Sequence, residues 1–185
     1  MKPLPNRQQV RRLIYSIRDF SHADSALAFL FEEYDFDLNY SGTQLRKFSF
    51  IESTAIIAFC RPLVHAKNGT TLNLGLAEIK LQDEEQVLRD RLIEIRHRIV
   101  AHSAESDMHY RLSVLLPFDD RPDIPFPQLL LDDSLVLTQQ ELRDFQELVS
   151  KLIYRLSTYL FELARSNRSL LEEYVEPLPG SPRRV

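Results

Sequence analysis

The chain has 185 residues, of which 44% are hydrophobic and 27% are charged, a balance typical of one globular domain and unlike that of a disordered chain. The net charge of −4 excludes a general nucleic-acid coat, although a local basic site is still compatible with it. A single cysteine, Cys60, excludes an internal disulfide and a cysteine-based metal site, and the absence of a long apolar run or leader predicts a cytoplasmic protein without a membrane partner.

The first half of the chain is expected to form long helices. Hydrophobic residues at helical spacing predict one helix, or two joined helices, over residues 7–32. Ser21 lies where this spacing weakens, and it is a candidate cap for a second helix start. Gly42 predicts a turn, and a second helix is expected over 43–61, ending close to Pro62.

The middle of the chain changes from a helical to a strand-like period. A third helix is expected over 83–102, because its acidic first turn suits the positive end of the helix dipole. Hydrophobic and polar residues then alternate over 108–116, which predicts a strand. Two short apolar runs over 129–137 are a candidate partner strand.

The last helix has a clear start in the sequence. Thr138 with Glu141 fits a capping box, and the helix is expected to continue to about Asn167. Residues 176–185 are expected to be a disordered tail, which leaves 1–175 as a single domain. The predicted fold is mainly α: an up-and-down bundle of four to five helices with a small two-stranded β appendage.

The end of the third helix carries the residues that suggest chemistry. At 100° per residue, His102 lies about 40° from the apolar stripe of this helix, and Arg96 and Arg98 lie about 80° to either side. His97 points to the opposite face. Imidazole transfers protons near neutral pH, and guanidinium groups bind phosphate. We therefore take Arg96, His102 and His97 as candidate catalytic residues, and Arg98 and Arg91 as candidate substrate-binding residues, with no metal or other cofactor.

The segment from Arg96 to His102 resembles the signature of the HEPN superfamily, the higher-eukaryote and prokaryote nucleotide-binding domains. In that signature an arginine, often followed by a polar residue, precedes a histidine after a gap of about four to six residues; here the gap is five and His97 takes the polar place. The chain is most similar to the abortive-infection branch, through residues 60–68 and 100–103. The resemblance covers about 7–167.

The resemblance implies a function and a mode of assembly. It implies a metal-independent endoribonuclease of a prokaryotic defence or toxin–antitoxin system, with RNA as substrate and a nucleotidyltransferase-type antitoxin as a possible partner. It also implies a homodimer with a composite site. One chain supplies a single histidine beside the stripe, whereas two chains supply both a base and an acid.

Two alternatives stay open at this stage. The same fold can serve as a non-catalytic module that binds RNA, a nucleotide or a protein partner. The chain can also be a structural helical adaptor in which the arginines lie at the surface and pair with Glu94 or Glu105. His65, near Arg61 and Lys67, is a weaker candidate for anion binding.

Overall fold

A computed structural model of the chain describes residues 4–65, 70–101, 111–115, 126–130 and 134–171. The helices are α1 (Arg7–Glu33), α2 (Gly42–Cys60), α3 (Asp83–Ala101) and α4 (Gln139–Ser166), with two short 3₁₀ turns, η1 (Leu74–Ala77) and η3 (Arg168–Leu170). The strands are β1 (Arg111–Leu115) and β2 (Phe126–Leu130). The prediction of a mainly helical fold is confirmed. No helix in the described ranges is long and apolar enough to cross a membrane.

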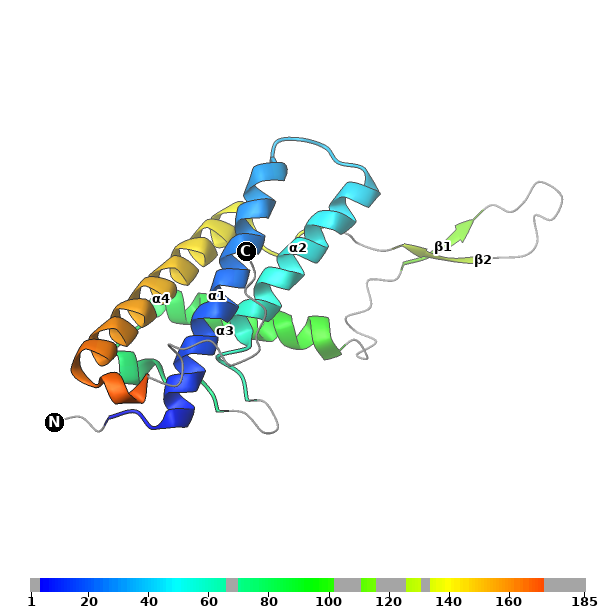
Figure 1. The fold of residues 1–185 in the computed structure, drawn as a ribbon. Helices are drawn as coiled ribbons and strands as arrows, with labels where there is room; N and C mark the ends of the chain where they lie inside the picture. Colours follow the sequence, from blue (N-terminus) through cyan, green and yellow to red (C-terminus); the bar gives the residue numbers. More distant parts are fainter. Residues whose placement is uncertain (1–3, 66–69, 102–110, 116–125, 131–133, 172–185) are drawn as a thin grey trace, which may run out of the picture.

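Three of the helices lie side by side and the fourth crosses them (Figure 1). α1 packs against α2 on one side and α4 on the other, while α3 contacts α2 and α4. α1 and α2 form an antiparallel pair, so the beginning of α1 lies near the end of α2. The crossing of α3 is a departure from a simple up-and-down order, and it brings the last turns of α3 toward the end of α2.

Aromatic contacts join the three aligned helices at the centre of the core. Phe20 of α1, Phe59 of α2 and Phe145 of α4 are fully buried. The ring centroids of Phe20 and Phe59 lie 5.6 Å apart, and those of Phe59 and Phe145 lie 5.1 Å apart. Tilted and edge-on ring pairs at these distances add to the free energy gained from burial. α3 contributes Leu92 and Ile95 to the same core.

The start and end of α4 were predictable from local sequence. The Thr138 hydroxyl accepts a hydrogen bond from the Glu141 N–H, and the Glu141 carboxylate accepts one from the Thr138 N–H, so the expected capping box is present. Each bond satisfies a backbone donor that the first helical turn leaves unpaired. The helix ends at Ser166, with Asn167 as its C-cap, as the sequence predicted.

Of the two alternatives for residues 7–32, the single helix is confirmed, because α1 continues without a break. The Ser21 hydroxyl donates to the Ile17 carbonyl of its own helix and does not cap a new one. Gly42 is the first residue of α2 and not part of a separate turn. Ser41 is the N-cap, and it forms a capping box with Gln44.

The two strands pair in antiparallel register, from Arg111 opposite Leu130 to Leu115 opposite Phe126. The return strand therefore lies earlier than the expected 129–137. Residues 134–137 instead lead into α4, and Leu137 is buried. The reason is a polar contact with α2, described below. The predicted tail lies outside the described residues.

Candidate functional site

Four of the five residues singled out from the sequence lie on α3, and the structure describes their side chains. They are Arg91, Arg96, His97 and Arg98. His102 follows the last residue of α3 and lies outside the described residues. The geometry of the arginines can therefore be compared directly, whereas the position of the candidate histidine stays a prediction.

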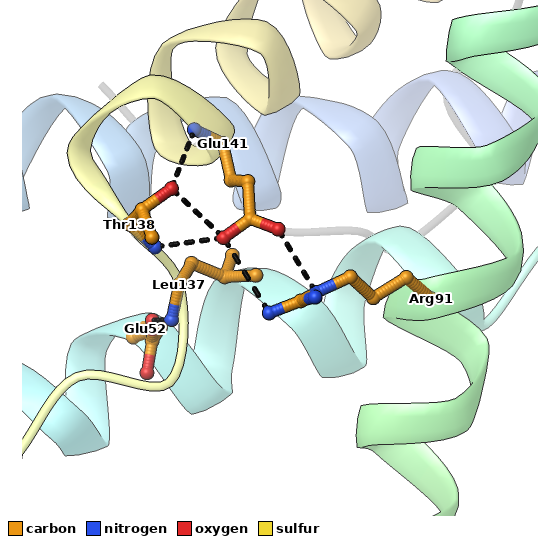
Figure 2. A network of polar contacts seen from close by, with 5 residues as sticks. All are labelled: Glu52, Arg91, Leu137, Thr138 and Glu141. Carbon is orange, nitrogen blue, oxygen red and sulfur yellow. Dashed lines mark hydrogen bonds and ion pairs between the residues drawn. The ribbon is translucent and has the colours of Figure 1, made fainter.

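Arg91 is held by a carboxylate of α4. Its Nε lies 3.0 Å from Oε1 of Glu141, and its Nη2 lies 3.5 Å from Oε2 of the same carboxylate. Figure 2 shows this pair between α3 and the first turn of α4. Because Glu141 also caps α4, the contact gives Arg91 a structural role in joining the two helices.

Arg98 and His97 face solvent. Nη2 of Arg98 lies 2.5 Å from Oε1 of Glu94, and both side chains are largely exposed. This is the surface pairing that the adaptor alternative expects, and such pairs contribute little to stability. His97 is exposed, so it is available to solvent and to a bound ligand.

Arg96 differs from its neighbours. It is partly buried, and it forms no hydrogen bond or ion pair with any residue in the described part of the chain. Its charge acts on the buried thiol at the end of α2: burial raises the pKa of Cys60 to about 12, and Arg96 opposes that shift. Cys60 is therefore an inert packing residue, as expected from its small apolar character. Arg96 lies beside the C-terminal end of α2, and no carboxylate of the described residues pairs with it.

The end of α2 also carries a polar cluster that the sequence reasoning missed, formed by Arg12, Asp19 and Arg61. Arg12 and Asp19 lie on α1, and Arg61 is the C-cap of α2. Nη2 of Arg12 lies 3.7 Å from Oδ2 of Asp19, and Nη1 of Arg61 lies 3.7 Å from Oδ1. The spacing of Arg12 and Asp19, seven residues apart on one helix face, was visible in the sequence. The sequence analysis had grouped Arg61 with His65, which is exposed, and with Lys67, which lies outside the described residues.

A second missed residue is Glu52 of α2, a carboxylate that is only 1% exposed. Its Oε2 accepts a hydrogen bond from Val136 N at 2.9 Å, and its Oε1 accepts one from Leu137 N at 2.8 Å. Figure 2 shows the carboxylate beneath the segment that enters α4. Burial raises the pKa of Glu52, the two backbone donors oppose that rise, and the charge of Glu141 adds to it.

The position of Glu52 could have been noticed from its place on α2. It lies on the same helix face as Phe48, Ala55 and Phe59, all of which are buried. A carboxylate inside an apolar stripe must accept hydrogen bonds or remain neutral. Burying an unpaired charge costs on the order of several kcal/mol, even after the surrounding protein has adjusted to it. The donors here come from the strand-like segment 134–137, which explains why that segment packs on α2.

The described residues contain no group of three or more His, Cys, Asp or Glu side chains that could hold a metal ion. No protein-family model, curated protein or solved structure matches the chain. The chemistry of the site is therefore argued from its own residues and from the resemblance of the Arg96–His102 segment.

Proposed function

We propose that this protein is a metal-independent endoribonuclease with a HEPN-like helical bundle, acting in the cytoplasm in a prokaryotic defence or toxin–antitoxin system. Arg96 binds the scissile phosphate, and His102 transfers protons, with His97 as a second candidate for that role. Arg98 and Arg91 lie along the same helix and are candidates for contacts to flanking phosphates, although Glu94 and Glu141 compete with RNA for them.

The observation that carries the proposal is the unpaired state of Arg96. Arg91 and Arg98 on the same helix each have a carboxylate partner, whereas Arg96 has none within the described ranges and is partly withdrawn from water. A guanidinium in that setting gains more from a phosphate oxygen than an ion-paired one, because no existing contact has to be broken.

The proposed reaction is a transesterification within RNA. The ribose 2′-oxygen attacks the phosphorus while the bond from phosphorus to the 5′-oxygen breaks, leaving a 2′,3′-cyclic phosphate and a 5′-hydroxyl. One imidazole takes the proton of the 2′-hydroxyl, and a second gives a proton to the departing 5′-oxygen. Arg96 stabilises the extra negative charge on the phosphate oxygens.

The need for two proton-transferring groups supports a homodimer. On a helix that reached residue 102, at 100° per residue, Arg96 and His102 would lie about 120° apart, so a single chain would bring them together poorly. A twofold axis places His102 of one chain near Arg96 of its partner and supplies both an acid and a base. We expect a solution mass of twice 21.7 kDa. A monomer in light scattering that still cleaves RNA would contradict the composite site.

The test compares RNA cleavage by purified Arg96→Ala and His102→Ala variants with that of the wild type in the presence of EDTA. We expect each to lose about 100-fold or more in rate, because each removes a group that acts in the transition state. Arg89→Ala is the matched control, since Arg89 lies on the same helix and pairs with Asp90. Mixed dimers of the Arg96→Ala and His102→Ala chains are expected to recover part of the activity. Cleavage that survives both single changes, or products without a cyclic phosphate end, would reject the proposal.

A second candidate function is a non-catalytic module that binds a protein, such as a nucleotidyltransferase-type antitoxin, or RNA, because fewer arginines are available to a catalytic site than the sequence suggests. Two of the arginines on α3 that were singled out from the sequence are already engaged by carboxylates, Arg91 by Glu141 and Arg98 by Glu94. Purified protein that binds RNA but does not cut it at any tested pH would support this function over catalysis.

A further inference from the structure

The cluster of Arg12, Asp19 and Arg61 contains more positive than negative charge, which a purely structural role does not explain. Two guanidinium groups share a single carboxylate, and each of the two separations is 3.7 Å. That distance is too long for a direct hydrogen bond, for which about 2.7–3.2 Å is usual. Among the described residues the cluster therefore keeps a net positive charge, and Asp19 holds neither arginine tightly.

Arg12 shows the imbalance most clearly. Its Nε and Nη2 atoms are buried, and neither donates a hydrogen bond within the part of the chain that the structure describes. These two nitrogens form one edge of the guanidinium, which fits two oxygens of a phosphate or carboxylate. The hydroxyl of Ser16, in the next turn of α1, donates to the Arg12 carbonyl and is not a partner of the guanidinium. Leaving a buried donor without an acceptor destabilises the folded chain, because the donor has lost its hydrogen bonds to water.

The cluster is open on the side of Arg61. The Arg61 side chain is 54% exposed, whereas those of Arg12 and Asp19 are 22% and 16% exposed. An anion can therefore reach Arg61 from solvent and share the position that Asp19 occupies between the two guanidinium groups. A neutral ligand would gain nothing from the net charge of the cluster.

The location connects this cluster with Arg96. Arg61 directly follows Cys60, and the charge of Arg96 is felt by the Cys60 thiol. In Figure 1 the end of α2 meets α3, and contacts between these two helices support that view. Arginines of α1, α2 and α3 therefore lie near the end of α2.

We propose that Arg12 and Arg61 form an oxyanion subsite that takes a phosphate group, and that Asp19 is an internal competitor for that group. The inference rests on the proposed function insofar as the phosphate is that of an RNA substrate, beside the one that Arg96 contacts. The alternative source is free inorganic phosphate. Asp19 then sets the affinity, because a bound phosphate must replace the contacts of Asp19 with both guanidinium groups.

The experiment measures binding by the full chain to two probes. The first is a fluorescent single-stranded RNA with 2′-O-methyl groups throughout, which lacks the attacking hydroxyl and cannot be cleaved by the proposed reaction. The second is inorganic phosphate, followed by calorimetry. Binding to the uncleavable RNA does not depend on catalysis, so a failure of this inference and a failure of the proposed nuclease are seen separately.

The arginine and aspartate variants are expected to change the binding affinity in opposite directions. Arg61→Gln and Arg12→Gln are expected to weaken binding about tenfold or more, in line with the loss of one hydrogen bond to a charged group. Asp19→Asn is expected to strengthen binding by a similar factor. Arg18→Gln is the matched control, because Arg18 lies exposed on α1 outside the cluster and the charge change is the same; a change of less than about twofold is expected from a screened surface charge.

Each outcome either supports or overturns the proposed subsite. Weaker binding in the Arg61 variant with stronger binding in the Asp19 variant supports the subsite, and the probe that responds identifies RNA or free phosphate as its ligand. Equal effects of Arg61→Gln and Arg18→Gln would overturn it, since only net charge would then matter. Absence of binding to both probes would also overturn it, and would leave a bridging water as the occupant. The gain expected from Asp19→Asn cannot arise from misfolding.

Discussion

Two polar clusters lie along α2, and they differ in how completely their polar atoms are satisfied. In the middle of the helix, the Glu52 carboxylate accepts hydrogen bonds from two backbone N–H groups. At the end of the helix, Arg12 and Arg61 share Asp19 at distances too long for direct hydrogen bonds. Glu52 is fully withdrawn from solvent, and Arg12 and Asp19 are largely so, whereas Arg61 is open to it.

The difference separates a structural role from a binding role. A buried carboxylate with its acceptors filled holds two parts of the chain together, and its removal leaves donors stranded. A partly buried arginine pair whose N–H groups have no acceptor can form new hydrogen bonds to a ligand without breaking existing ones. Strain of this kind is common where a protein binds or reacts, because optimised stability and function often conflict there.

The largest effect is expected from Glu52→Ala. The change leaves the Val136 and Leu137 N–H groups without their acceptor, and Leu137 N is buried with no other partner among the described residues. We expect the free energy of unfolding to fall by about 2–4 kcal/mol, measured by urea denaturation. Glu147→Ala, which removes an exposed carboxylate of α4, is the control and should change stability by less than about 0.5 kcal/mol. A Glu52 variant as stable as this control would break the contrast between the clusters.

A smaller effect concerns pH. Because the pKa of Glu52 is raised in the folded chain, the folded state binds a proton more readily than the unfolded state does. The contribution of Glu52 to stability is therefore greatest at acidic pH and decreases as the pH rises through the folded-state pKa. Glu52→Gln keeps an acceptor and removes the titration. As the pH rises, the unfolding free energy of this variant should therefore increase relative to that of the wild type. Parallel pH profiles for the two proteins would show that burial does not control the ionisation of Glu52.

The smallest effect is expected from Arg12→Met, which keeps the length of the side chain but removes its buried donors. The free energy of unfolding should stay within about 1 kcal/mol of the wild type or increase, since replacing unsatisfied buried charge by an apolar chain is often neutral or stabilising. Thermal unfolding measures this, with Arg18→Met as the exposed counterpart on the same helix. A loss as large as that for Glu52→Ala would mean that Arg12 is a structural residue.

Local sequence was enough to predict the helices and one of their caps. Thr138 and Glu141 lie three residues apart, so their reciprocal hydrogen bonds were recognisable without any knowledge of the fold. The choice between one helix and two around Ser21 stayed open, because a serine inside a helix can also bond to the carbonyl four residues earlier. Sequence spacing does not distinguish these two uses of a serine hydroxyl.

The two polar clusters could not be predicted from the sequence, for a different reason. Glu52 finds its donors 84 and 85 residues away, and Arg61 meets Asp19 only because α1 and α2 pack antiparallel. Contacts of this kind depend on tertiary structure. The ion pair of Arg98 with Glu94, four residues apart on one helix, was by contrast among the alternatives weighed from sequence.

The hydrogen bonds of Glu52 also bear on how the chain tolerates changes in length. They fix Val136 and Leu137 against α2, directly before the α4 capping box. The end of α3 and the start of α4 are therefore held independently of the number of residues between them. The entropy of closing a loop rises only with the logarithm of its length, and a doubling costs about 0.6 kcal/mol. A change in the number of residues between His102 and Val136 is therefore expected to cost the helical core little, whether evolution or a protein engineer makes it.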